Sequence, residues 1–189
     1  MATYEESGLR LTLPDDRHFR FADLAPYRAL SGQHLKEMDF AWIDGQGRLI
    51  LLEVRSYAQV TETLTGPDFM PTKGRAAPFR FQALLDKVTD TLLMLAAAWA
   101  GTDWGRTLSP LLPQAARQPL PLKVVIAVDL PPALTVHLQG LRDSLNARLQ
   151  GRLALVDVPR VVLIDHARLL SNPMFSSFVQ TARPCQVQA

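Results

Sequence analysis

The sequence predicts an α/β protein with a central mixed β-sheet flanked by helices. Three stretches carry this prediction. Residues 39–57 hold two apolar, aromatic-rich runs on either side of a glycine-containing loop, as in a β-hairpin. Residues 79–99 repeat apolar side chains at helical spacing, and residues 122–130 form a nearly continuous β-branched run that is typical of a buried parallel strand. The order hairpin, helix, strand indicates a helix that crosses over one face of a sheet.

A chain of 189 residues is long enough for one domain with a sizeable core. We expect this core over about residues 38–165, with an N-terminal lead-in over residues 1–35 and a weakly structured tail from about residue 172. Cys185 is the single cysteine, so no internal disulfide can form, and a reducing cytoplasm is the expected location. The sequence has no signal-peptide pattern and no run of about 20 apolar residues, so no membrane association is expected.

The lead-in contains one clear strand signal. Leu9–Leu13 alternates leucine with polar residues and ends at a proline, which predicts a short strand. His18–Leu24 forms either a second short strand or an irregular segment, and residues 26–33 are expected to be a turn-like link. Glu5 and Glu6 are expected in a solvated N-terminal tail.

The loop of the hairpin sets the register of its two strands. If residues 45–47, Gly-Gln-Gly, form a three-residue turn, Asp44 faces Arg48 and, further along, Asp39 faces Glu53. Side chains directly across a ladder lie about 5 Å apart, so two carboxylates would meet on one face of the sheet. Such a pair is costly unless a cation lies between the acids, and Mg²⁺ is a usual partner. A turn of two or four residues would separate the acids.

These residues resemble the active-site hairpin of the PD-(D/E)xK nuclease superfamily, which has the restriction-endonuclease-like fold. The family pattern has an acid on one strand and acid-x-lysine on the next, and Asp39 and Glu53-Val54-Arg55 occupy these places over a resemblance that spans about residues 38–130. The resemblance implies that Asp39 and Glu53 bind Mg²⁺ or Mn²⁺ and that Arg55 is the third catalytic residue. Arginine replaces the motif lysine here, and its guanidinium can bind phosphate but is a poor proton-transfer group.

A basic, proline- and glycine-containing loop follows the hairpin. It covers residues 58–78, and loops of this length are often functional. Lys73, Arg75 and Arg80 would lie beside the acids and could bind a phosphate backbone. The alternative is a solvated surface loop.

The helix over residues 79–99 supplies two further candidates. Family members sometimes contribute a glutamine or a relocated lysine from this helix, and Gln82 near its start would be a substrate-binding residue. Lys87 is interpreted as a surface lysine spaced i,i+3 from Asp90. Gly101 is expected to end the helix. The stripe that should pack on the sheet consists of Phe81, Leu84, Leu85, Val88, Leu92, Leu95 and Trp99.

The C-terminal half continues the alternation of elements. Residues 102–121, rich in proline, are expected to be a link, and residues 133–150 a helix with leucines on one face. Leu153–Val156 and Arg160–Asp165 are expected to form one kinked strand or two short ones. The aromatic residues of the tail could cover an edge of the core or contact a partner.

Two classes of function remain open. The first is a metal-dependent nuclease acting on nucleic acid, with DNA favoured over RNA. The second is a catalytically inactive relative that binds nucleic acid or serves in an assembly, and either could act as a homodimer or in a larger complex. In a third interpretation, which involves no ligand, Asp39 and Glu53 only form salt bridges with Arg55 at the edge of the hairpin. The histidines are scattered and nucleotide-binding glycine motifs are missing, so neither a zinc site nor a nucleotide-binding fold is expected.

Overall fold

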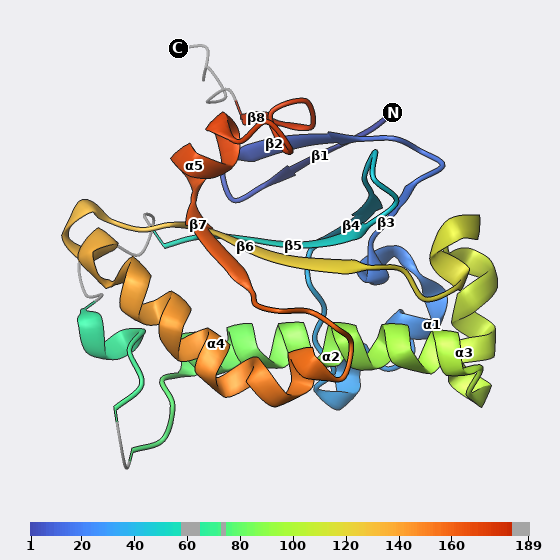
Figure 1. Ribbon diagram of the computed structural model, residues 1–189, viewed down its shortest axis with the longest axis horizontal. Helices are drawn as coiled ribbons and strands as arrows, with labels where there is room; N and C mark the ends of the chain where they lie inside the picture. The colour runs from blue at the N-terminus through green and yellow to red at the C-terminus, as the bar shows by residue number, and fades with distance from the viewer. Residues whose placement is uncertain (58–64, 73–74, 183–189) are drawn as a thin grey trace.

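The computed structural model describes residues 1–57, 65–72 and 75–182, and these residues form three layers (Figure 1). A five-stranded sheet is the middle layer, two long helices cover one of its faces, and a three-stranded sheet lies over the other. The predicted α/β class is confirmed as a mixed sheet with helices, although the strands form two sheets.

The five-stranded sheet has the order β3-β4-β5-β6-β7. Its first three strands form an antiparallel meander, whereas β6 and β7 run parallel to β5. The strands are β3 (His18–Phe19), β4 (Phe40–Ile43), β5 (Leu49–Ser56), β6 (Leu122–Asp129) and β7 (Val162–Asp165). Strand β5 therefore lies at the centre of the sheet, and its carboxyl end lies beside that of β6.

The three-stranded sheet brings together the two ends of the described chain. Strands β1 (Ala2–Glu6) and β8 (Val179–Thr181) both pair with β2 (Leu9–Leu13). Of these three strands, the sequence had predicted β2. The expectation of a solvated N-terminal tail is wrong, because Ser7 and Gly8 take positive φ values of 50° and 82° and turn β1 back onto β2. The expectation of a weakly structured tail from residue 172 is wrong as far as β8.

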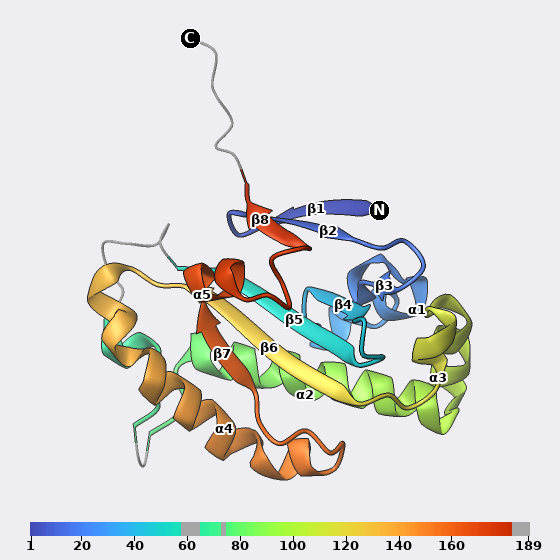
Figure 2. The ribbon, with the colours of Figure 1, turned by 45° about the horizontal axis from the view of Figure 1, so that its top comes forward.

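Helix α2 (Phe79–Ala100) connects the parallel strands β5 and β6, and α4 (Leu138–Ala154) connects β6 and β7. Both lie on the same face of the sheet (Figure 2). Gly101 ends α2 with a φ of 66°, as expected. The shorter helices are α1 (Ala25–Arg28), α3 (Asp103–Leu108) and α5 (His166–Ser171), and 3-10 turns cover Phe21–Asp23, Ser31–Gln33, Gly66–Asp68, Ser109–Leu111, Gln114–Arg117 and Pro132–His137.

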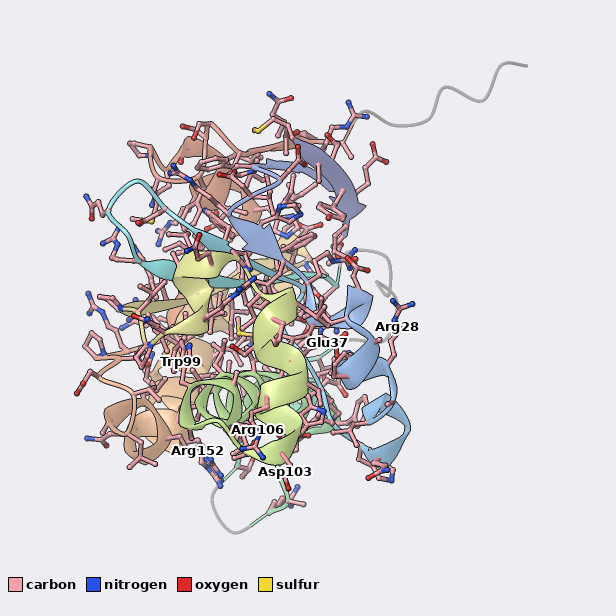
Figure 3. The ribbon with its side chains drawn as sticks, turned by 90° about the vertical axis from the view of Figure 1, so that its right-hand side faces the viewer. Arg28, Glu37, Trp99, Asp103, Arg106 and Arg152 are labelled. Carbon is pink, nitrogen blue, oxygen red and sulfur yellow. The ribbon has the colours of Figure 1, made fainter. Side chains whose placement is uncertain are left out.

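The segment expected to be a link after α2 contains α3, which packs against α2. Thr102 begins α3, because its side-chain hydroxyl accepts a hydrogen bond of 3.0 Å from the backbone N–H of Gly105. A Cβ atom at Gly105 would collide with the backbone carbonyl of Ala97, so only glycine permits this approach of the two helices. Figure 3 views this end of the molecule, with Asp103 and Arg106 on the outside of α3.

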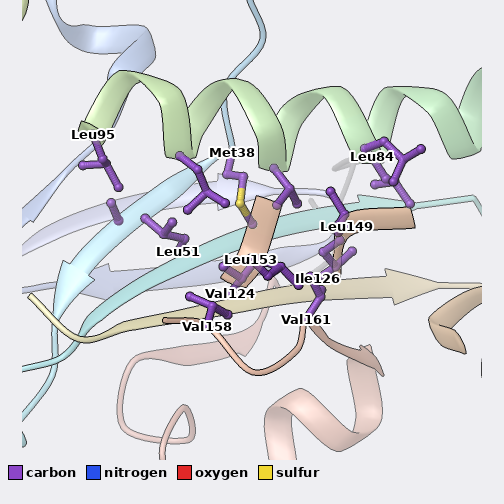
Figure 4. Close-up of a cluster of buried hydrophobic side chains, with 14 of the residues drawn as sticks. Met38, Leu51, Leu84, Leu95, Val124, Ile126, Leu149, Leu153, Val158 and Val161 are labelled. Carbon is purple, nitrogen blue, oxygen red and sulfur yellow. The ribbon is translucent and has the colours of Figure 1, made fainter. Parts of the chain in front are cut away.

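The expected strand at Leu153–Val156 is wrong, because α4 continues to Ala154. Its buried residues repeat every four positions and Leu153 extends that stripe by one more turn: Leu141, Leu145, Leu149 and Leu153. The strand expected over Arg160–Asp165 exists as β7. Figure 4 shows Leu149 and Leu153 together with Val158 and Val161, which follow α4 in the chain.

Side chains of β5 alternate between two cores. Leu49 and Leu51 point into the core shared with α2 and α4, whereas Ile50, Leu52 and Val54 point into the core under the three-stranded sheet. The predicted stripe of α2 faces the first core, and all its members are buried except Trp99, which is partly buried. No helix within the described ranges is long and apolar enough to cross a membrane.

Candidate active site

The hairpin of β4 and β5 has the predicted register. Phe40 pairs with Leu52, and the backbone N–H of Asp44 donates a hydrogen bond of 3.0 Å to the carbonyl of Arg48. Three residues therefore form the loop, and the last of them, Gly47, has a φ of 73° that favours glycine. Continued by one residue beyond Phe40, this register brings Asp39 beside Glu53.

Asp39 and Glu53 share one ammonium group, that of Lys87 on α2. The Lys87 Nζ atom lies 3.1 Å from Asp39 Oδ1, 2.7 Å from Glu53 Oε1 and 2.8 Å from Glu53 Oε2. Glu53 is fully buried, and Lys87 is 9% exposed. Asp39, which directly precedes β4, also accepts a hydrogen bond of 2.8 Å at Oδ2 from the backbone N–H of Val54 in β5. The three charged groups therefore form one buried cluster.

The interpretation of Lys87 as a surface lysine is wrong. The chain before β4 is hydrogen-bonded to α2, and these contacts fix the rotation of the helix about its axis. The backbone N–H of Met38 donates to Thr91 Oγ1 at 2.9 Å, and that of Lys36 donates to Asp90 Oδ2 at 3.0 Å. Asp90, the expected partner of Lys87, is therefore engaged by Lys36. Lys87 lies one helical turn from Thr91, so it faces the sheet next to Asp39.

Arg55 leaves the same face of β5 as Glu53 and forms an ion pair with it. Its Nε atom donates to Glu53 Oε1 at 2.6 Å, and its side chain is 41% exposed. Burial acts to lower the pKa of Arg55, but the carboxylates of Glu53 and Asp39 outweigh it and raise the pKa above its usual value. Arg55 thus remains a cation, with part of its side chain open to solvent.

The environment of Glu53 favours its protonated form. Burial raises the pKa of Glu53 to about 8, and the carboxylate of Asp39 contributes in the same direction. Lys87 and Arg55 oppose this rise without cancelling it. Functional sites often contain a carboxyl group with a shifted pKa, and ligand-binding groups often lie towards the carboxyl ends of the strands, as Glu53 does here beside two cations.

A pocket of about 380 Å³ adjoins the cluster. Four basic side chains contribute to its lining, and within the described chain no acidic side chain does: Lys36, Arg55, Arg80 and Lys87. Lys36 is paired with Asp86 at 2.7 Å, whereas the side chain of Arg80 forms no hydrogen bond or ion pair with any described residue. The pocket therefore offers a phosphate group cations on several sides.

The remaining substrate-binding candidates do not gather at the cluster. Arg75 and Gln82 are both exposed, and the side-chain amide of Gln82 donates a hydrogen bond of 2.6 Å to Asp86 rather than to a residue of the cluster. Lys73 lies outside the described residues. Of the predicted set, the structure brings together Asp39, Glu53, Arg55 and Arg80, and it adds Lys36 and Lys87.

The N-terminal acids lie in β1. Glu5 forms an ion pair with Arg10 across the hairpin at 2.6 Å. Glu6 accepts a hydrogen bond from the hydroxyl of Ser7, which also lies 3.3 Å from the carbonyl oxygen of Val54. This segment thus contacts the backbone of β5 at Val54, next to the cluster.

Within the described ranges, no group of three or more histidine, cysteine, aspartate or glutamate side chains is placed to bind a metal ion. The cluster offers two carboxylates. Comparison of the chain with family models, with curated proteins and with solved structures found no match.

Proposed function

We propose that the protein is a metal-dependent nuclease that hydrolyses phosphodiester bonds in nucleic acid, with DNA favoured over RNA. The observation that carries the proposal is the sharing of one lysine ammonium by two carboxylates, that of Asp39, which directly precedes β4, and that of Glu53 in the neighbouring strand β5. The resemblance to the PD-(D/E)xK superfamily implies an acid on each of two strands and a lysine beside them. The hairpin, crossover helix and parallel strand around the cluster are the elements that a restriction-endonuclease-like core would supply.

Lys87 takes the part that the family pattern gives to the lysine at position 55. It reaches both acids from α2, so arginine at position 55 does not deprive the site of a lysine. An ammonium group can orient a water molecule or an oxygen of the phosphate through its three donors, whereas guanidinium favours a planar fork of two contacts. Lys87 would hold the attacking water beside the two carboxylates and stabilise negative charge on the phosphate.

The two carboxylates fit Mg²⁺ or Mn²⁺, because Mg²⁺ is usually bound by one or two carboxylates together with water and substrate oxygens. The contacts of Lys87 Nζ with oxygens of both Asp39 and Glu53 support this assignment, because the two carboxylates lie close enough for one cation to contact both. Such an ion would supply a Lewis acid and lower the pKa of a bound water. Glu53 must be ionised to bind it, so its raised pKa makes metal binding dependent on pH.

Arg55 and Arg80 would bind the phosphate. Arg55 is fixed at one end by Glu53, and its exposed part lines the pocket together with Arg80. Both can form charge-assisted hydrogen bonds with phosphate oxygens. Their place between the acids and solvent would orient the scissile bond towards the carboxylates.

A second function, a catalytically inactive relative that binds nucleic acid, is favoured by one observation. When Glu53 is ionised, Lys87 and Arg55 together balance the charge of Asp39 and Glu53, so the four side chains satisfy one another without a metal. In this case the cluster stabilises the hairpin, and the cations of the pocket provide binding alone.

Cleavage of labelled single- and double-stranded DNA with Mg²⁺ or Mn²⁺ tests the proposal. Asp39→Asn, Glu53→Gln and Lys87→Ala should each abolish cleavage, whereas Arg106→Ala, which removes an exposed cation from α3, should leave it unchanged. Circular dichroism would verify that each variant folds. Cleavage that survives Glu53→Gln would contradict the proposal. Nucleic-acid binding by a wild-type protein that binds no metal at millimolar concentration would establish the inactive alternative.

A further inference from the structure

Phe79 is an exposed aromatic ring at the edge of the pocket. It is the first residue of α2 and is 80% exposed, and among the large hydrophobic side chains exposed in the described ranges it alone is aromatic. Its ring lies 5.9 Å from Lys36 Nζ, within the range of a cation–π contact. Figure 1 shows the start of α2 below the carboxyl end of β5.

The pocket combines this ring with an apolar lining and with cations. Tyr57, Ala83 and Leu84 contribute apolar surface, and the basic side chains described above contribute charge. Its volume of about 380 Å³ is within the range of about 300–1,000 Å³ that is typical of small-ligand pockets. One aromatic face, apolar walls and several cations match the base and the phosphate of a nucleotide.

An unpaired base fits this arrangement better than a base pair. Proteins that bind single strands place a basic groove along the backbone and stack bases on aromatic side chains, because every base has a π face. In a duplex these faces are covered by neighbouring base pairs. Phe79 precedes Lys87 by eight residues, about 12 Å along the helix axis, which corresponds to about three to four stacked nucleotides.

We infer that this pocket binds single-stranded nucleic acid, with an unpaired base stacked on Phe79 and the adjoining phosphates at Lys36 and Arg80. The inference rests on the nucleic-acid substrate of the proposed function, and it names the form of that substrate. It does not require catalysis, so binding can be measured in EDTA, without any metal.

The test compares the affinity of labelled oligo(dT) and of a blunt DNA duplex by fluorescence anisotropy at one salt concentration. Phe79→Ala should weaken oligo(dT) binding roughly tenfold and duplex binding less than about twofold, since stacking on one aromatic residue is typically worth that much. Phe79→Trp should restore the affinity. Oligo(dT) should also quench the tryptophan fluorescence that this variant shows in excess of the wild-type protein. Leu93→Ala is the matched control, because Leu93 is an exposed apolar residue of the same helix, 61% exposed.

Equal losses on oligo(dT) and duplex, or no loss in Phe79→Ala, would overturn the inference. The same selective loss on oligo(U) would support the pocket and extend it to RNA. Selective, Phe79-dependent binding by a protein that cleaves nothing would uphold the inference and remove the nuclease proposal. If the protein cleaves DNA and Phe79→Ala changes neither the rate nor the KM of cleavage, the nuclease proposal stands and this inference is overturned.

Discussion

Replacing Lys87 with methionine should destabilise the fold far more than a surface substitution does. Methionine fills a similar volume but removes the ammonium that contacts three oxygens of Asp39 and Glu53. Removal of one partner from a buried ion pair typically costs about 3–5 kcal/mol of stability, whereas substitution of an exposed lysine typically changes stability by no more than about 0.5 kcal/mol. Lys36→Met is the matched control. Its ion pair with Asp86 is about one-third exposed, and its loss should cost at most about 1 kcal/mol.

Urea unfolding at two pH values measures these losses. The pKa of Glu53 is about 8 in the folded chain and has a usual value of 4.5, so the folded state binds more protons between these values. This contribution to stability is therefore fully present below about pH 4.5 and is lost as the pH rises through about 8. Without Lys87 the pKa of Glu53 rises further, and the loss caused by Lys87→Met should be smaller at pH 5 than at pH 8.

A double-mutant cycle with Glu53→Gln isolates the interaction of the two residues. We expect the sum of the stability losses of the two single variants to exceed the stability loss of the double variant by about 1–3 kcal/mol, as for residues in one ion-pair network. A Lys87→Met protein as stable as the Lys36→Met control at pH 8, with no coupling to Glu53, would refute the buried cluster.

Four further outcomes are expected. Calorimetric titration should show Mg²⁺ or Mn²⁺ binding that strengthens as the pH rises through about 8, where Glu53 loses its proton, and that disappears in Asp39→Ala. In cleavage assays Arg55→Lys should retain most activity, because it keeps a cation beside the phosphate, whereas Arg55→Ala should lose at least about tenfold. Arg80→Ala should reduce the salt dependence of single-strand binding by about 0.7 in the slope of log affinity against log salt, one phosphate contact. Gly105→Ala should destabilise the protein by at least about 2 kcal/mol in thermal unfolding, because the added methyl group meets a backbone carbonyl of α2.

The hairpin could be predicted from sequence because its determinants are local. A three-residue loop ending in Gly47 fixes the register, and the alternation of apolar side chains fixes which face Glu53 occupies. The two long helices could also be predicted from sequence, because their apolar side chains repeat at helical spacing over several turns. Both acids of the cluster follow from this information alone.

Lys87 could not be found in the same way. Its helical position is certain from sequence, but whether it faces solvent or the sheet depends on the rotation of α2. That rotation is set by contacts with residues some fifty positions earlier, among them Met38 with Thr91. A usable signal was present, because Lys87 is spaced i,i+3 from Leu84 and i,i+4 from Thr91, both of which are buried.

The strands at the two ends of the described chain were missed for a related reason. β1 and β8 are short and carry no strong apolar alternation, and each becomes a strand only because β2 lies beside it. Pairing of residues 9–11 with residues 179–181 connects positions that are far apart in sequence, and no local pattern reports such a contact.

This pairing also sets an order of events during synthesis. Among the described elements, β2 leaves the ribosome after β1 and before all the others, and its second neighbour, β8, leaves last. Until then Trp42, which packs against Phe175 and Phe178, lacks these partners, and one edge of β2 is open. The layer over the main sheet is therefore completed late, and a nascent chain interrupted before β8 would present an unpaired edge above an uncovered aromatic core. Such an intermediate is a natural target for chaperones.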